Sequence, residues 1–207
     1  MNLKEFFEKV VSVLQKEDLR FALAGGLVAS IYREQERLTK DLDFLLLAQG
    51  DSLEIARGIT EKMGLEAHVI RKADLEGGPL FAVRKKSTTP YMVLGRRKNA
   101  IGLDFILPAM PGFDSAMERA QENLIDFGFG KIPCLTVEDI ILAKFYSYQN
   151  DLTRFNDLDD LKSIFAAQPD LEIDYLCEQM KRRNLTIPVP LKKLVPKTLV
   201  LLSKRKK

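Results

Sequence analysis

Two aspartates in alternating positions are the most informative chemical feature of the sequence. Asp41 and Asp43 begin residues 41–47, whose apolar part is long enough only for a buried strand. Because side chains alternate along a strand, both carboxylates face one side, about 7 Å from one another along the strand. Two like charges this close favour a cation between them, and Mg²⁺ takes carboxylates together with substrate phosphates. A pair of solvated acids at a strand edge is the alternative, which the apolar run disfavours.

A third aspartate stands alone in another apolar run. Asp104 is the single charged residue in residues 101–107. An isolated buried carboxylate shifts its pKa or recruits a cation. With Asp41 and Asp43 it predicts a three-carboxylate site for two Mg²⁺ ions, in which one ion activates an attacking oxygen and both stabilise the developing charge.

A glycine pair separates an expected strand, residues 21–24, from an expected helix, residues 27–32. Gly25 and Gly26 have no side chains, so backbone N–H groups can approach a ligand there, and the helix N-terminus favours an anion. The pair therefore predicts a phosphate site, although two glycines also serve as simple turn chemistry.

Polar residues precede the paired aspartates in a loop. Arg37 could hold a phosphate bidentately, and Thr39 stands two residues before Asp41. The alternative is that both are ordinary polar residues of a loop. A basic turn at residues 96–98 could contact an acceptor molecule or form a hydrated hairpin tip.

Charged residues of the C-terminal half lie in expected helices. Lys144 has apolar neighbours in the helix opened by Thr136, so it either extends to water or meets an anion. Arg154, Asp157 and Asp160 follow at three-residue steps on one helical face, a pattern that is also typical of a salt-bridged surface.

These motifs together resemble the nucleotidyltransferase superfamily, which has the fold of DNA polymerase beta. The resemblance is greatest to its AbiEii-like branch, which includes toxins of bacterial toxin–antitoxin systems. The segment Tyr32-Arg33-Glu34 departs from that branch, which usually has a glycine there. The matches run in order over about residues 21–161, namely Gly25-Gly26, Arg37-x-Thr39-x-Asp41-x-Asp43, Asp104, Thr136-x-Glu138-Asp139 with Lys144, and Arg154-x-x-Asp157-x-x-Asp160.

The resemblance implies a magnesium-dependent nucleotidyltransferase that moves a nucleotide from an NTP to an acceptor hydroxyl. It implies that two Mg²⁺ ions bind Asp41, Asp43 and Asp104. The implied nucleotide-binding residues are Gly25, Gly26, Arg37 and Thr39, and the implied catalytic residues are Asp41, Asp43, Asp104, Lys144 and Asp157.

The acceptor and the biological role stay open at the level of sequence. We expect RNA, for example the end of a tRNA, although a protein hydroxyl or an aminoglycoside fits the same catalytic residues. A toxin whose antitoxin covers the site is a second hypothesis. A catalytically silent module that binds nucleotide or RNA is the alternative to an enzyme.

The charge is unevenly distributed. The chain has 207 residues, with 32 Lys and Arg against 29 Asp and Glu, and a formal charge of +3. Residues 181–207 carry ten Lys or Arg and no Asp or Glu, so residues 1–180 carry −7. Such a basic tail predicts a polyanionic partner such as RNA, and a solvated charged helix end is the alternative.

The composition excludes several classes of protein. Cys134 and Cys177, with no further cysteine, support neither a disulfide scaffold nor a Cys/His zinc site, and we expect two reduced thiols. No apolar stretch reaches the roughly 18 residues of a membrane span. The acids among the first ten residues speak against a targeting peptide, so we expect a cytoplasmic protein with no membrane partner.

The elements needed to position the motifs follow from hydrophobic periodicity. We expect helices over residues 2–17 and 51–64, and strands over 66–71, 80–85, 91–94 and 99–107. From residue 111 the pattern is helical, with helices over 136–149 and 155–167, one capped by Asp170, and a short last one. We therefore predict an α+β fold, with a mixed sheet and packed helices over residues 1–130 and a helical half with a basic tail over 131–207. The resemblance implies that this sheet is of the nucleotidyltransferase type.

Overall fold

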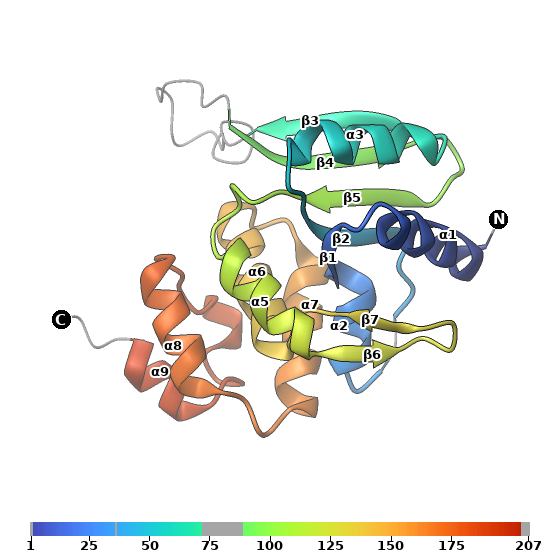
Figure 1. Ribbon diagram of the computed structural model, residues 1–207. Coiled ribbons are helices and arrows are strands. Elements are labelled where there is room, and N and C mark those ends of the chain that lie inside the picture. Colours follow the sequence, from blue (N-terminus) through green and yellow to red (C-terminus); the bar gives the residue numbers. More distant parts are fainter. Residues whose placement is uncertain (1, 36, 72–88, 204–207) are drawn as a thin grey trace. The chain divides into compact units, whose positions relative to one another are not determined.

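The protein is described by a computed structural model that covers residues 2–35, 37–71 and 89–203 (Figure 1). The chain divides into two compact units. The first consists of Met1–Leu27 and Leu38–Leu135, and the second consists of Val28–Arg37 and Thr136–Lys207. The strand expected over residues 80–85 lies outside the described residues.

The first unit contains a five-stranded mixed sheet. Its strands in spatial order are β1 (Arg20–Ala24), β2 (Asp41–Leu47), β5 (Gly102–Ile106), β4 (Pro90–Arg96) and β3 (Glu66–Arg71). Only β2 and β5 pair in parallel, and the other neighbours are antiparallel. The parallel pair is buried at the centre of the sheet, as the apolar runs of both strands require. The mixed sheet confirms the predicted α+β class.

Helices α1 (Leu3–Lys16) and α3 (Ser52–Lys62) belong to the same unit (Figure 1). Both begin at a side-chain cap: Asn2 accepts the N–H of Glu5, and Asp51 accepts the N–H groups of Leu53 and Glu54. Phe7 of α1 packs on Phe44 of β2, which packs on Phe105 of β5, with ring centroids 6.1 and 6.2 Å apart. This aromatic row buries one face of the sheet and leaves the alternate residues of β2 and β5 for the other face.

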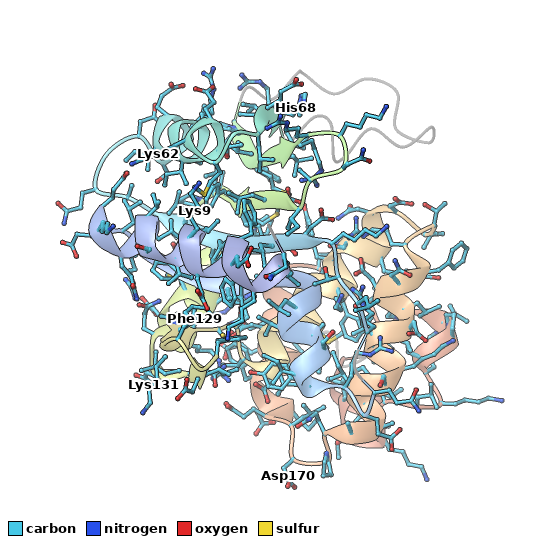
Figure 2. The ribbon with its side chains drawn as sticks, turned by 90° about the vertical axis from the view of Figure 1, so that its right-hand side faces the viewer. Lys9, Lys62, His68, Phe129, Lys131 and Asp170 are labelled. Atoms are coloured by element: carbon cyan, nitrogen blue, oxygen red, sulfur yellow. The ribbon has the colours of Figure 1, made fainter. Side chains whose placement is uncertain are left out.

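A hairpin follows α5 (Phe113–Glu122), where the sequence pattern had predicted only helix. Its strands are β6 (Leu124–Asp126) and β7 (Lys131–Pro133). Gly128 and Gly130 both have positive φ, which allows the turn. Phe127 and Phe129 pack edge-on against Phe7 at 5.0 and 5.1 Å, and Figure 2 labels Phe129 on this hairpin. The aromatic contacts stabilise a strand pair that is too short to show a period-2 pattern.

The second unit is helical, as predicted for this part of the chain. It contains most of α2 (Gly25–Tyr32), then α6 (Val137–Asn150), α7 (Phe155–Ala167), α8 (Ile173–Arg182), the 3₁₀ turn η1 (Val189–Leu191) and α9 (Lys197–Ser203). Thr136 caps α6 as expected, since its hydroxyl oxygen accepts the N–H of Asp139. The prediction that Asp170 caps α8 is wrong. That helix begins after Glu172, whose N–H donates to the Glu138 carboxylate at 3.1 Å and so fixes the helix start.

Both cysteines are free and buried, as predicted. Burial raises the pKa of the Cys134 thiol to about 12, so this thiol behaves as a small apolar side chain. Among the described residues, no helix combines the length and apolar character that crossing a membrane requires.

Candidate active site

The strand register places two of the predicted metal ligands side by side. Asp43 of β2 pairs with Asp104 of β5, and the same row continues through Leu94 of β4 to His68 of β3. Residues paired in a sheet share a face, and neighbouring strands lie about 4.8 Å apart. Asp41 stands two residues before Asp43 and therefore faces the same side. The three predicted carboxylates thus share one face of the sheet, opposite the aromatic row.

Two glycines leave the space that these carboxylates occupy. A Cβ added to Gly25 would lie 1.9 Å from Oδ2 of Asp43, and one added to Gly102 would lie 2.1 Å from Oδ1 of Asp41. Gly25 also has φ +64°, in the left-handed region, and it starts α2 immediately after β1 ends at Ala24. The glycine turn therefore lies directly against the Asp43 carboxylate.

The third carboxylate is held by an arginine. The guanidinium of Arg96 donates to both oxygens of Asp104, at 2.8 Å between Nη2 and Oδ2 and in a second short bond between Nη1 and Oδ1. Burial raises the pKa of Asp104 above its ordinary value, and the hydrogen bond and charge of Arg96 offset only part of this rise.

These residues can be compared with what Mg²⁺ requires. Three carboxylates on one face, with glycine backbone beside two of them, supply the oxygen ligands that this ion prefers. Within the described part of the chain, however, no three acidic, histidine or cysteine side chains converge on a single ion position. The donor types therefore fit Mg²⁺, and Arg96 places a positive charge beside one of them, Asp104. The metal site stays a prediction.

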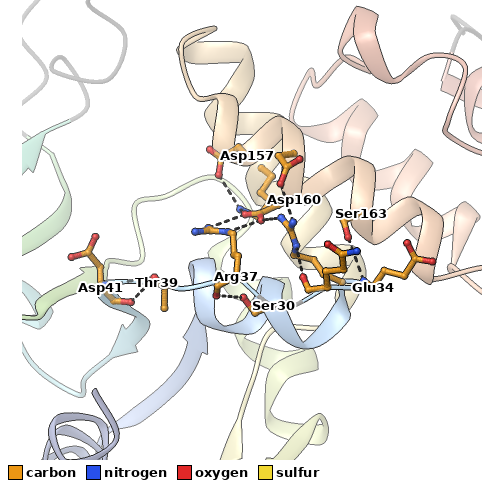
Figure 3. Close-up of polar contacts among 12 residues, drawn as sticks. Ser30, Glu34, Arg37, Thr39, Asp41, Asp157, Asp160 and Ser163 are labelled. Atoms are coloured by element: carbon orange, nitrogen blue, oxygen red, sulfur yellow. Dashed lines mark hydrogen bonds and ion pairs between the residues drawn. The ribbon is translucent and has the colours of Figure 1, made fainter. Parts of the chain in front are cut away.

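Thr39 lies beside the acidic strand. Its hydroxyl donates to the backbone carbonyl of Asp41 at 3.2 Å (Figure 3). It also lines, with Lys40, a surface pocket of about 610 Å³. The threonine therefore fixes the start of β2, and its predicted contact with a nucleotide stays a prediction.

The second unit buries a network of ion pairs around Asp160. Lys144 of α6 donates to Asp157 at 2.9 Å and to Asp160 at 2.5 Å, and both aspartates lie on α7. The side chains of all three are less than a tenth exposed. The alternatives that Lys144 extends to water and that these aspartates form a surface salt bridge are therefore both wrong. Arg154 pairs with Asp157 at the edge of the network.

Two arginines complete this network (Figure 3). Arg37 donates to both oxygens of Asp160, at 2.7 and 3.0 Å, and Arg33 forms a further ion pair with the same carboxylate. Arg33 also reaches the exposed Asp159 at 2.9 Å. Burial by itself raises the pKa of Asp160, but the hydrogen bond from Arg37 and the charge of Lys144 outweigh it, so the pKa lies below its ordinary value. Asp160 is therefore ionised and holds three cations.

Sequence reasoning missed the roles of three residues. Arg96 was placed in a basic turn, whereas it is the last residue of β4, two positions beyond the Leu94 that pairs with Asp104, and its guanidinium binds Asp104. Extending the period-2 pattern of that strand by two residues would have put it on the acidic face. Arg33 and Asp160 were noted only as parts of motifs, and their pairing, 127 positions apart in sequence, has no local signal.

The remaining candidates are peripheral. His68 is exposed on β3 (Figure 2) and lies two strands from Asp104, roughly 10 Å away at ordinary strand spacing. In the tail, Lys192, Lys193 and Lys197 are exposed, and residues 204–207 lie outside the described part of the chain.

Comparison with known families identifies the family of this chain. A profile of the family described as "Nucleotidyl transferase AbiEii toxin, Type IV TA system" matches residues 11–205. The chain belongs to this family. It is thus a nucleotidyltransferase of a toxin family, as the order of motifs in the sequence had indicated. Comparison with curated proteins gives no match.

Solved nucleotidyltransferases have the same fold as this AbiEii family member. ANT(2″)-Ia in complex with adenylyl-2″-tobramycin aligns with a TM-score of 0.55 at 12% identity, covering 87% of this chain and 97% of that one. The lincosamide antibiotic adenylyltransferase LnuA, with lincomycin bound, aligns with a TM-score of 0.51 at 19% identity, covering 81% of this chain and 99% of that one. An antigenic nucleotidyltransferase-like protein from Paracoccidioides brasiliensis aligns with a TM-score of 0.50 at 16% identity, covering 94% of this chain and 93% of that one. At these identities the similarity concerns the fold, and it confirms the predicted nucleotidyltransferase-type sheet.

Proposed function

We propose that this AbiEii family member transfers a nucleotide from an NTP to a hydroxyl of RNA, with Mg²⁺ held by Asp41, Asp43 and Asp104. The observation that carries the proposal is the row across the sheet in which Asp43 lies beside Asp104 and against Gly25. It places a carboxylate pair next to backbone N–H groups at a helix start, where a triphosphate can bind.

Each residue has a defined part in the proposed reaction. Backbone N–H groups at Gly25 and Gly26 hold the triphosphate, and Asp104 accepts the proton of the acceptor hydroxyl. The hydroxyl oxygen bonds to the α-phosphorus, the bond from that phosphorus to the bridging oxygen breaks, and pyrophosphate leaves. When bound, Mg²⁺ supplies positive charge that stabilises the phosphates and the attacking oxygen.

Lys144, Arg37 and Asp157 are assigned supporting roles. Their ion pairs with one another and with Asp160 support a rigid arrangement in which Lys144 keeps a fixed position. A preorganised ammonium or guanidinium stabilises phosphate charge without reorganisation during the reaction. We propose that Lys144 and Arg37 act on the nucleotide in this way and that Asp157 orients the lysine.

RNA is the proposed acceptor because the chain carries a polyanion-binding signal apart from its active site. The positive charges of residues 181–207, among which Lys192, Lys193 and Lys197 are exposed, offer phosphate contacts that no acid in that segment cancels. The experiment offers total cellular RNA, total protein and an aminoglycoside in turn, each with Mg²⁺ and an NTP labelled at the α-phosphate. Label in RNA supports the proposal. Label in protein or aminoglycoside alone contradicts the RNA acceptor, and binding without label in any of them favours the silent module.

We also propose that the chain acts as a toxin in the cytoplasm and that an antitoxin counters it. The family to which it belongs supports this role. Expression should arrest growth, whereas expression of Asp41→Ala should not, because the toxin acts through the transferase site. The Asp170→Ala variant, which removes an exposed acid on a loop (Figure 2), should arrest growth like the wild type. Equal growth of cells that express the wild type and cells that express Asp41→Ala contradicts the proposal.

A further inference from the structure

Arg96 lies where the acidic face of the sheet needs a cation. Its two Nη atoms each donate to one oxygen of Asp104, so a cation that binds this carboxylate meets a guanidinium charge already in place. The side chain of Asp104 is 8% exposed and that of Arg96 is 41% exposed. The arginine can therefore move into solvent, whereas the buried aspartate must find another partner if it does.

Arg96 also interacts electrostatically with the other two carboxylates, those of Asp41 and Asp43. Its hydrogen bond with Asp104 raises the pKa of the guanidinium above its ordinary value, and the negative charges of Asp41 and Asp43 add to the rise. The point at which a Cβ of Gly102 would stand lies 2.1 Å from Oδ1 of Asp41 and 2.9 Å from Nη1 of Arg96. One guanidinium thus neutralises part of the charge of all three acids.

Counting charges gives the consequence for metal binding. Three carboxylates carry −3, and Arg96 reduces this to −2, which one divalent cation balances. A second divalent cation at Asp104 is repelled by the guanidinium that already binds both oxygens. We infer that Arg96 is a positioning residue that holds Asp104 in the metal-free protein and competes with a divalent cation for this carboxylate. The inference rests on the proposed function, because it takes the three aspartates as metal ligands.

The experiment measures Mn²⁺ binding to the full chain by calorimetry, with Mn²⁺ as the probe for the divalent site. Arg96→Gln removes the competing charge, and we expect it to bind Mn²⁺ about tenfold more tightly than the wild type. Arg96→Lys keeps the charge and loses the bidentate bond, so its affinity should lie between the two. Arg97→Gln is the control, because Arg97 is the exposed next residue and forms no ion pair with the described residues.

Thermal melting supplies a second readout. Without metal, Arg96→Gln should melt at a lower temperature than the wild type, because Asp104 loses its counter-ion, and Mn²⁺ should raise its melting temperature by more than it raises that of the wild type. A merely structural arginine would lower the melting temperature without tightening Mn²⁺ binding.

The outcomes separate the inference from the proposed function. If the wild type binds Mn²⁺ and Arg96→Gln binds it equally or more weakly, the role of Arg96 is overturned and the metal site stands. If neither protein binds Mn²⁺ while both remain folded, the metal site of the proposed function fails, and the role of Arg96 fails with it.

Discussion

At the scale of single residues, the site depends on what two glycines leave out. The Asp43 carboxylate occupies the position that a side chain at Gly25 would take, and the Asp41 carboxylate does the same at Gly102. A methyl group at either position would displace an acid from the face that the three carboxylates share. These glycines are therefore part of the site, although neither presents a side chain to a substrate.

Replacing Gly25 by alanine should disable the enzyme. The added Cβ would overlap Oδ2 of Asp43 at 1.9 Å, and φ of +64° is strained for alanine. A displacement of this size costs roughly 10²-fold in rate, and nucleotide transfer measured at saturating NTP should fall by at least that factor.

The matched control is Gly58→Ala. This glycine lies inside α3, has no atom within 4 Å of its added Cβ, and has no left-handed φ. Alanine there should leave the transfer rate unchanged and raise stability by up to about 1 kcal/mol, as urea unfolding would measure. Full activity of Gly25→Ala would contradict the geometry of the glycine turn.

The carboxylates were predictable from the sequence, whereas their cationic partners were not. Asp41, Asp43 and Asp104 are acids in apolar strands, a conflict visible in a short window, and the parallel pairing of β2 with β5 brings two of them together. Arg96 and Arg33 are charged residues at the ends of elements, where charge is ordinary. Only the sheet register and the packing within the helical unit reveal that each binds a buried carboxylate.

At the scale of elements, α7 holds its unit together through one carboxylate. Asp160 is fully buried and forms ion pairs with three cations. Lys144 lies on α6, and Arg33 and Arg37 follow the end of α2 in the chain. Three cations converge on one acid, so removing that acid leaves all of them without their central partner.

Asp160→Asn should therefore destabilise the protein by about 3 kcal/mol at pH 7, as urea unfolding would measure. Asp159→Asn is the control, because its side chain is 64% exposed and forms only one ion pair, with Arg33, among the described contacts. That change should cost about 0–1 kcal/mol. Equal effects of the two variants would show that the network does not stabilise this unit.

The stability difference between the wild type and Asp160→Asn should depend on pH. The pKa of Asp160 lies below its ordinary value in the folded protein, so its contribution is complete above its unfolded pKa of about 3.9. It is lost as the pH falls through the lower folded pKa. Urea unfolding between pH 3 and 7 should give a constant difference above about pH 5 and a smaller one at pH 3. A difference that grows on acidification contradicts the assigned charge state.

Whole elements also differ in whether a short stretch of sequence predicts them or distant residues determine them. Long amphipathic helices such as α1, α6 and α7 were predictable to within a few residues because their periodicity and caps are local. The hairpin of β6 and β7 was not, since its three-residue strands depend on packing of Phe127 and Phe129 against Phe7, more than a hundred residues away. The start of α8 likewise depends on the hydrogen bond that the backbone N–H of Glu172 donates to Glu138.

At the scale of the whole molecule, the sequence separates its charges. The excess of acids in residues 1–180 includes the three proposed metal ligands, and residues 181–207 carry only positive charges. An acidic transferase site repels a nucleic acid unless cations elsewhere bind its phosphates. The tail is the segment with the charge to do so.

Changing Lys192, Lys193 and Lys197 together to glutamine should weaken RNA binding. If all three contact phosphates, the slope of log K against log salt should fall by about 2 for single-stranded RNA. The control removes the same charge from three exposed lysines of α1, namely Lys4, Lys9 and Lys16, and should leave the slope unchanged. An equal fall of the salt slope in both variants would show that RNA binding depends only on the net charge of the protein.

The central claim is that Asp41 and Asp43 carry Mg²⁺-dependent nucleotide transfer. The most direct test incubates the wild type and the Asp41→Ala, Asp43→Ala double variant with Mg²⁺, cellular RNA and NTPs labelled at either the α- or the γ-phosphate. We predict that the wild type transfers the α-label and not the γ-label, and that the double variant transfers neither while keeping the wild-type circular dichroism spectrum. A folded double variant that transfers the α-label at the wild-type rate would contradict the account.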